Sequence, residues 1–332
     1  MRKLIQMDIN DIKVVFSNTA NQLHFHPSIV EKDFWVCYML DCLFNYSEFK
    51  DAFVFKGGTS LSKSYHVIER FSEDIDLIID WRRIISDGSN PWDYRSKTKQ
   101  DQYNKQINSY AADFYKSQLA AALNTELSKT LGEGTWIEID ETDNMVINFK
   151  YPRMFKTEYI APYVRLEIGP LAEWAPSHKT AITPFVAEKY PQFFEQTTTN
   201  VLTVDAERTF WEKITILHKI ANFPKNKILP LRYARHLYDV YCLARSDIKE
   251  SALNKKELLE KDITFKQKFY YSKSAHYETA TIKEVRLIPA EHIMKELQAD
   301  YKAMKNMFYG DIPKFDDIIC ELNKLEAEIH NL

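Results

Sequence analysis

Residues 52–80 constrain the fold of this chain more than any other part of its sequence. The apolar run 52–55 fits a short buried strand, and it ends at Lys56-Gly57-Gly58, which is a turn signal. A helix is then expected to run to about Arg70. From Ser72 to Asp80 polar and apolar residues alternate, which predicts a second strand. The sequence therefore predicts a strand–turn–helix–strand unit, and we call Ser72–Asp80 the acidic strand.

The alternation in the acidic strand puts two carboxylates on one face. Asp74 and Asp76 are two residues apart, so both side chains point to the same side, while Ile75 and Leu77 point to the other. Carboxylates this close repel each other unless a cation lies between them, and divalent cations bind such oxygens. The spacing indicates a metal site. The alternative is a polar strand face that only contacts water.

The turn before the acidic strand predicts a phosphate site beside the metal site. Gly57 and Gly58 allow the backbone to approach a phosphate closely, and the following helix offers free N–H groups. The alternative is a plain left-handed turn with Thr59 or Ser60 as the helix cap. The segment matches neither the phosphate-binding loop pattern nor the glycine-rich dinucleotide fingerprint.

A third carboxylate, Glu167, is expected on another strand. Within Tyr163–Gly169 the apolar residues face the core, which leaves Arg165 and Glu167 on the opposite face. If this strand lies beside the acidic strand, Glu167 completes a three-carboxylate site suited to two-metal phosphoryl transfer. The alternative is a solvated face formed by the arginine and the glutamate.

Two helices in the second half carry polar residues suited to phosphate. In the helix expected over Asp205–Asn222, Lys213 lies beside an apolar stripe, where it is placed to reach a nucleotide as a point charge. In the helix expected over Leu231–Arg245, Arg235 and Asp239 share one face. The alternative for this second pair is a surface ion pair of little energetic weight.

The chain as a whole reads as an α+β half followed by a mostly helical half. Further elements are expected as a long helix over 99–131 and strands over 136–140 and 145–151. Prolines punctuate a loop-rich region after Gly169, and the boundary is expected between about Pro170 and Thr203. We therefore expect a first domain over 1–175, with a helical insertion at about 95–131, and a second domain over 176–332.

Composition excludes several classes of protein. The net charge of −3 does not predict a nucleic-acid binder, although a local basic face can still contact phosphates. None of the 4 cysteines forms a Cys-x-x-Cys pair, so a zinc site has little support. The sequence shows neither a signal-peptide pattern nor an apolar run that spans a bilayer, so we expect a cytoplasmic protein with no membrane partner.

These residues together resemble the AbiEii/AbiGii toxin family of nucleotidyltransferases. The segments that carry the resemblance are Phe55–Leu61, Arg70–Leu77, Arg208–Ile214 and Arg235–Val240, flanked by Val30–Val36 and Met307–Gly310. The resemblance covers about residues 30 to 325. It implies a DNA polymerase β-like nucleotidyltransferase core with a mixed sheet, followed by a helical C-terminal domain that closes over the nucleotide.

The resemblance also implies roles for individual residues. Asp74 and Asp76 are expected to bind Mg²⁺, with two metal ions in the site, and Lys213 and Asp239 are expected to be needed for catalysis. The expected nucleotide-binding set consists of Lys56, Gly57, Gly58, Thr59, Ser60, Lys63, Arg70, Ser72, Lys213 and Arg235. Glu167 is expected as the third metal ligand, on the strand alternation rather than on the resemblance.

The expected function is the transfer of a nucleotide from an NTP to an acceptor hydroxyl on tRNA or on a protein. Characterised members of the family act as toxins of toxin–antitoxin or phage-defence systems, so a cognate antitoxin is an expected partner. Two alternatives remain open at this point. One is a metal-dependent nucleotide-sugar glycosyltransferase, which predicts a Rossmann-like parallel sheet. The other is a non-catalytic nucleotide-binding interaction module.

Overall fold

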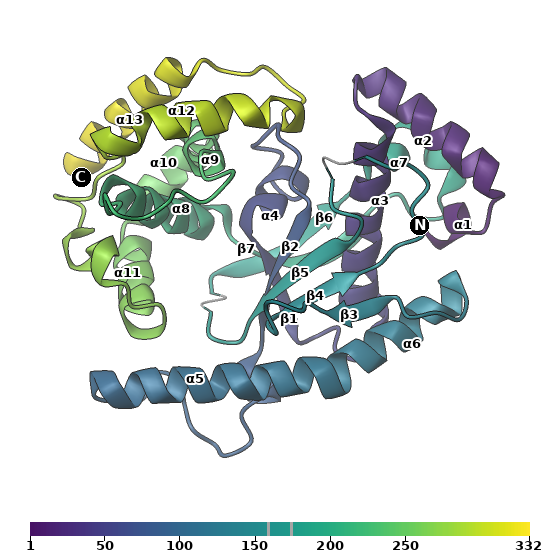
Figure 1. Cartoon of the computed structure of the whole chain (residues 1–332), viewed down its shortest axis with the longest axis horizontal. Helices are drawn as coiled ribbons and strands as arrows, with labels where there is room; N and C mark the ends of the chain where they lie inside the picture. Colours follow the sequence, from purple (N-terminus) through teal and green to yellow (C-terminus); the bar gives the residue numbers. More distant parts are fainter. Residues whose placement is uncertain (158–159, 173–174) are drawn as a thin grey trace. The chain divides into compact units, whose positions relative to one another are not determined.

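The computed structural model describes residues 1–157, 160–172 and 175–332, which form two compact units (Figure 1). The first unit comprises residues 1–64 and 71–203. The second comprises residues 65–70 and 204–332. The short segment 65–70 therefore belongs to a different unit from the residues that precede and follow it.

A mixed sheet forms the centre of the first unit. In the described residues its strands are β1 (Phe53–Lys56), β2 (Asp74–Ile79), β3 (Ile137–Ile139), β4 (Val146–Phe149), β5 (Val164–Gly169), β6 (Ser177–Ile182) and β7 (Thr199–Val204). Their order across the sheet is β3-β4-β5-β2-β1-β7-β6. Strand β2 runs parallel to β5 and antiparallel to β1, and β1 runs parallel to β7. The acidic strand is thus an inner strand of the sheet.

The burial of β2 follows its alternating sequence. Ile75, Leu77 and Ile79 are buried on one face, where they join the hydrophobic core of the first unit. Asp74 and Asp76 lie on the other face and are half-buried. Ile78 lies on that second face but is buried too, so the polar part of the face is confined to the first half of the strand.

Helices pack around this sheet. They are α1 (Arg2–Ile5), α2 (Ile9–Leu23), α3 (Pro27–Asp41), α4 (Gly57–Lys63), α5 (Lys97–Phe114), α6 (Ala120–Leu131) and α7 (Phe185–Lys189). Helix α3 packs against β5, and α6 packs against β3 (Figure 1). A π-helical turn at Tyr115–Leu119 joins α5 to α6, so the long helix expected over 99–131 is present with this one irregularity.

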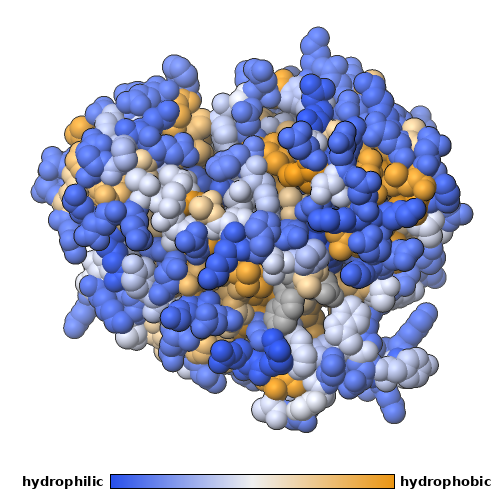
Figure 2. Space-filling model, turned by 180° about the vertical axis from the view of Figure 1, so that it is seen from behind, coloured by the Kyte–Doolittle hydropathy of each residue, from blue (hydrophilic) through white to orange (hydrophobic). Residues whose placement is uncertain are grey.

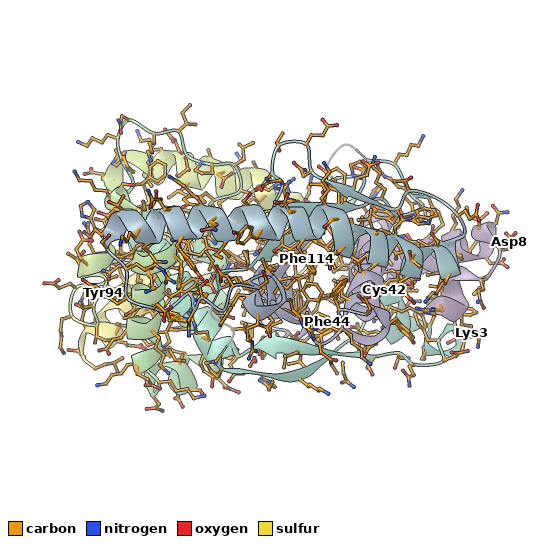
Figure 3. All side chains as sticks on the ribbon, turned by 90° about the horizontal axis from the view of Figure 1, so that it is seen from below. Lys3, Asp8, Cys42, Phe44, Tyr94 and Phe114 are labelled. Atoms are coloured by element: carbon orange, nitrogen blue, oxygen red, sulfur yellow. The ribbon has the colours of Figure 1, made fainter. Side chains whose placement is uncertain are left out.

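The core of the first unit extends from the sheet to these helices. Phe114 of α5 and Cys42, which follows α3, belong to the core, and Phe44 packs against it (Figure 3). The ring of Phe114 also lies 5.2 Å from the ring of Phe49, measured between centroids. These contacts hold the long helix on the sheet unit.

The second unit is mostly helical. Its helices are α8 (Ala206–Ala221), α9 (Arg235–Ala244), α10 (Ile248–Leu253), α11 (Glu257–Phe269), α12 (Met294–Ala303) and α13 (Phe315–His330), with short 3₁₀ turns between them. Helix α8 packs against α9, α10 and α11. Its apolar stripe of Phe210, Ile214 and Leu217 is fully buried, as the sequence predicts.

Two helices are shorter than expected, each for a local reason. Helix α4 ends at Lys63 rather than near Arg70, because His66 adopts a left-handed φ of 53°. Residues 65–70 then form part of the second unit. There the N–H of Tyr309 donates to the carbonyl of Glu69 over 3.0 Å. Helix α9 begins at Arg235 rather than at residue 231, because Arg232 has a φ of 60°.

Two strands lie where a loop-rich region was expected. Strand β6 is an edge strand with mostly polar residues, so it lacks the apolar alternation that identifies a strand from sequence. Strand β7 pairs with β1 through Phe55 and Thr203. Because both strands belong to the sheet, the first unit extends to Thr203 and not to the expected residue 175.

In the parts of the chain that the structure describes, no helix is both long and apolar enough to cross a membrane. Hydrophilic side chains cover most of the face seen in Figure 2, where hydrophobic residues appear in separate patches.

Candidate active site

The register of the sheet places charged residues in a row across three strands. Asp76 of β2 lies opposite Lys56 of β1 on one side and opposite Glu167 of β5 on the other. Residues paired in this way share a face of the sheet. The condition set for Glu167, that its strand lies beside the acidic strand, is therefore met. Asp74 lies opposite Arg165 on the same face.

The glycine turn lies directly against Asp76. Gly57 has a φ of 79°, which only glycine adopts without strain. A Cβ atom added at this position would lie 1.9 Å from Oδ2 of Asp76. Any residue other than glycine would therefore push this carboxylate away as well as strain the turn. The sequence showed that glycine suits the turn, but not that the turn cradles an aspartate.

The donor set on this face fits a divalent cation. Asp74 and Asp76 supply hard carboxylate oxygens from one strand, and the absence of a side chain at Gly57 leaves the space that the Asp76 carboxylate occupies. In residues 1–157, 160–172 and 175–332, however, no group of three or more His, Cys, Asp or Glu side chains is already gathered as a metal site. Asp74 and Asp76 lie close together on β2, and a third carboxylate would have to move to join them as a ligand.

Glu167 is the candidate for that movement. Its side chain is 46% exposed, and its Oε1 accepts a hydrogen bond of 2.9 Å from Nε of Arg165. The same guanidinium lies 3.5 Å from Oδ2 of Asp140. Glu167 would have to turn from Arg165 to reach a cation beside Asp76. Its role as a ligand stays a prediction.

The hydroxyl groups of the turn bond to the protein backbone. Thr59 Oγ1 donates to the carbonyl oxygen of Asp74, and Ser60 Oγ donates to the carbonyl oxygen of Gly57 over 2.9 Å. Both residues are buried. Thr59 thus ties the turn to the acidic strand. Through these side chains the turn is held in shape.

The other expected nucleotide-binding residues of the first unit differ in their surroundings. Lys63 is buried and its Nζ lies 2.7 Å from Oδ1 of Asp33, so its charge is matched inside the core. Lys56 and Ser72 are half-buried, and Gly58 is buried. The roles of these residues in nucleotide binding stay predictions, and Lys63 is left out of the function proposed below.

In the second unit a buried carboxylate holds two cations. Asp239 has no solvent exposure. Its Oδ1 accepts from Nε of Arg70 over 2.6 Å, and its Oδ2 accepts from Nη2 of Arg70 over 2.9 Å and from Nζ of Lys213 over 2.8 Å. Burial acts to raise the pKa of Asp239, but Arg70 and Lys213 outweigh it and hold the pKa below its usual range.

This arrangement brings Lys213, Asp239 and Arg70 together. The carboxylate is part of a buried ionic cluster, so the alternative of a surface ion pair with Arg235 is wrong for Asp239. Arg235 itself is half-buried at the first position of α9. The Arg70–Asp239 contact was missed from the sequence, because the two residues are separated by 169 positions.

His236 completes the cluster. Its Nδ1 lies 3.4 Å from Nζ of Lys213. Burial, followed by the charge of Lys213, lowers the pKa of His236 well below its ordinary value. The imidazole is therefore neutral at physiological pH, and its Nδ1 is able to accept a hydrogen bond from the lysine.

A mixed sheet carries paired carboxylates on an inner strand, and a helix that begins with two glycines precedes that strand, which is the arrangement predicted for a nucleotidyltransferase. The family model of the nucleotidyl transferase AbiEii toxin, of type IV toxin–antitoxin systems, matches residues 39–320. The chain belongs to this family. The resemblance seen in the sequence is thereby confirmed.

One solved structure shares the fold. MenT4, a nucleotidyltransferase toxin from Mycobacterium tuberculosis H37Rv, is 16% identical with a TM-score of 0.51, over 96% of this chain and 90% of that one. The predicted fold, a core with a mixed sheet followed by a mostly helical part, is confirmed by this likeness. JHP933 from Helicobacter pylori is 13% identical with a TM-score of 0.45, over 92% of this chain and 94% of that one. A comparison with curated protein sequences found no match.

Proposed function

We propose that this enzyme uses Mg²⁺ to transfer a nucleotide from an NTP to a hydroxyl group of an RNA, with tRNA as the first candidate acceptor. The observation that carries the proposal is the contact of Gly57 with Asp76. A turn suited to approach a phosphate lies there against a carboxylate suited to hold a cation. The family's place in type IV toxin–antitoxin systems supports a toxic role and a cognate antitoxin as partner.

The residues of the acidic strand would bind and orient the triphosphate. Asp74 and Asp76 would hold the cation, with Glu167 joining them after it leaves Arg165. A cation bound there supplies neutralising charge for the triphosphate and for the attacking oxygen. Backbone N–H groups of the Gly57–Gly58 turn would bind phosphate oxygens. The oxygen of the acceptor hydroxyl would then bond to the α-phosphorus as the bond to pyrophosphate breaks, and the hydroxyl proton would pass to water.

Lys213 and Arg235 of the second unit are the predicted phosphate-binding cations. Lys213 and Arg235 are proposed to neutralise phosphate oxygens, which lowers the energy of a transition state with charge spread over the phosphoryl group. Asp239 is proposed to orient Lys213, and the 2.8 Å contact between Oδ2 and Nζ supports this role. Because Asp239 is also held by Arg70, the orientation of the lysine depends on two residues.

A labelling experiment tests the function directly. Wild-type protein and the double variant Asp74→Asn/Asp76→Asn are incubated with total RNA and each labelled NTP in turn, with Mg²⁺ or with a chelator. We expect one RNA class to be labelled by the wild type only, and only with Mg²⁺. Equal labelling by the double variant would overturn the assigned carboxylates. A labelled protein in place of RNA would change the proposed acceptor.

The two alternatives from the sequence fare differently. The glycosyltransferase predicted a Rossmann-like parallel sheet, and this prediction is wrong because β1–β2, β3–β4 and β4–β5 are antiparallel pairs. The non-catalytic module disagrees with membership of a nucleotidyltransferase family. NTP binding measured by calorimetry, without transfer to any RNA or protein, would be the result that revives it.

A further inference from the structure

Three consecutive charged residues lie inside the first unit. Glu31, Lys32 and Asp33 of α3 have exposed fractions of 0%, 1% and 3%. Burying a charge costs free energy unless the group is paired or hydrogen-bonded. Successive residues on a helix also point in different directions, about 100° apart, so the three side chains reach different neighbours. The contacts of each side chain therefore show which segment of the chain it holds against α3.

The outer two charges hold loops and helix ends. The carboxylate of Glu31 accepts hydrogen bonds from the backbone N–H groups of Met154 and Phe155, over 2.5 and 3.1 Å. Asp33 accepts from Nζ of Lys63 at the end of α4 and from the N–H of Phe185 at the start of α7, each over 2.7 Å. Neither of these carboxylates contacts the acidic strand in these bonds.

Lys32 contacts the strands that carry the predicted metal ligands. Its Nζ lies 3.3 Å from Oε2 of Glu73 and 3.0 Å from the carbonyl oxygen of Ala161, and it also donates to the carbonyl oxygen of Tyr163. Glu73 directly precedes β2, and Tyr163 directly precedes β5. The buried ammonium of Lys32 thus makes three contacts, and these connect the residues just before β2 with the residues just before β5.

The position of these contacts determines what they can align. Strands β2 and β5 are parallel, so their first residues lie at the same end of the sheet. Helix α3 packs against β5, and the ammonium of Lys32 contacts the chain at that end of the sheet. Asp74 and Asp76 follow Glu73 on one strand, and Glu167 follows Tyr163 on the other. A shift between the strand ends would change the distance between the carboxylates.

We propose that Lys32 is a positioning residue for the cation site: its ammonium holds the first residues of β2 and β5 together, so that Asp74 and Asp76 face Glu167 at the spacing a divalent cation needs. Lys32 touches neither substrate nor cation and acts through Glu73 and the Tyr163 carbonyl. This inference rests on the proposed function, because it assigns to α3 the alignment of the same metal site.

Four variants separate this role from general destabilisation. Lys32→Met removes the charge and keeps the length of the side chain. Glu73→Gln removes the charge of one partner but leaves the carbonyl contacts of Lys32, so it keeps a folded variant in the series. Asp76→Asn removes a proposed ligand. Arg208→Met is the matched control, because Arg208 is also a buried cation, 2.8 Å from a buried carboxylate of Asp262, and it lies in the second unit.

Two measurements are made on each full-length variant. Binding of Mn²⁺ alone, without nucleotide, is followed by electron paramagnetic resonance of the free ion. Hydrogen exchange by mass spectrometry reports the opening of residues 73–79 and 163–169. We expect Lys32→Met to weaken Mn²⁺ binding about tenfold or more, which is the usual effect of removing a residue that orients metal ligands. Exchange should rise in both segments, with a smaller effect of the same direction for Glu73→Gln.

The controls make each outcome decisive. Arg208→Met should bind Mn²⁺ as the wild type does and show no faster exchange in the two segments. If Asp76→Asn abolishes Mn²⁺ binding while Lys32→Met binds like the wild type with unchanged exchange, the role of Lys32 is overturned and the metal site stands. If the wild type itself does not bind Mn²⁺, the proposed metal site is wrong, and so is the role of Lys32 in aligning its ligands. The hydrogen-exchange data then show only whether Lys32 holds the two strands together.

Discussion

The acidic face of β2 and the buried cluster around Asp239 use the same chemical group in opposite ways. Asp74 and Asp76 are half-buried on one face of a sheet, two residues apart on one strand. Asp239 is fully buried, and its oxygens accept hydrogen bonds from Arg70 and Lys213. The first two carboxylates thus lie close to each other on a half-buried face, whereas the third lies between two cations inside the second unit.

This difference predicts which of the proposed site residues also stabilise the fold. Two like charges on one strand face repel each other, and a bound cation relieves that repulsion. A carboxylate between two buried cations stabilises the fold, because its removal leaves those cations without a counter-charge. Substitutions in the acidic strand should therefore lower activity with little loss of stability, whereas substitution of Asp239 should lower both.

The largest effect is expected at the acidic strand. Asp76→Asn should lower kcat/KM for nucleotide transfer by about 1000-fold, since the stabilisation of transition-state charge by a held cation amounts to several kcal/mol and each 1.36 kcal/mol is tenfold in rate. The midpoint of thermal unfolding should fall less than in Asp239→Asn, because Asp76 is half-buried whereas Asp239 is fully buried between two cations. Labelled NTP transfer and calorimetry measure the two. Activity within tenfold of the wild type would contradict the assignment.

The next largest effect is expected at Asp239. Asp239→Asn keeps the size of the side chain but leaves Arg70 and Lys213 buried without their carboxylate, which should lower the free energy of unfolding by about 3 kcal/mol or more. Urea unfolding measures the loss. As a control, Asp101→Asn breaks an exposed ion pair with Lys105 and should leave stability unchanged within error. Equal stability of Asp239→Asn and the wild type would show that the cluster does not stabilise the fold.

The acidic face was predictable because it depends on local periodicity. Alternation alone places Asp74 and Asp76 on one side of a strand, and the same rule places Glu167 opposite the core. The adjacency of the strands of Asp76 and Glu167 was a condition that sequence alone could not supply, and the parallel register now meets it. The features that depend only on the alternation of residues along a strand are therefore the ones that the sequence predicted correctly.

The buried cluster depends on contacts between distant segments, which periodicity does not reveal. Arg70 was expected in a helix that follows the glycine turn, but it lies in a segment bridged to Phe308. Its contact with Asp239 joins positions far apart in the chain, and so does the contact of Lys63 with Asp33. The three consecutive charges 31–33 in an otherwise apolar helix were the visible signal of buried ion pairs, but their partners could not be named.

A smaller effect is expected at the glycine turn, where strain and contact can be separated. Gly57→Ala and Gly88→Ala each place a side chain at a φ near 75–79°, so both carry a similar backbone cost. Only at Gly57 would the added Cβ meet a carboxylate, whereas nothing lies within 4 Å of the Cβ position at Gly88. Gly57→Ala should therefore lower nucleotide transfer about 100-fold through displacement of Asp76. Gly88→Ala should keep wild-type activity, and a similar loss in both variants would assign the effect to strain.

The smallest effects are expected from pH, where carboxylates of the two units should respond with opposite signs. Burial raises the pKa of Glu31, although the N–H groups of Met154 and Phe155 act against this shift. Its contribution to stability is thus present below the unfolded value of about 4.3 and is lost as pH rises through the folded pKa. For Asp239, whose pKa is lowered, the contribution is present above the unfolded value of about 3.9 and is lost as pH falls.

Glu31→Gln and Asp239→Asn test these signs against the wild type. Urea unfolding is measured for all three proteins at steps from acid to neutral pH. The stability that the wild type has over Glu31→Gln should shrink as pH rises above about 4, because only the wild type must then ionise a buried carboxyl. The stability it has over Asp239→Asn should instead shrink as pH falls below about 4, when Asp239 of the unfolded chain takes up a proton while the folded carboxylate stays ionised. The prediction is contradicted if both differences in free energy of unfolding change with pH in the same direction. Burial would then not destabilise the ionised Glu31 while the cations stabilise the ionised Asp239.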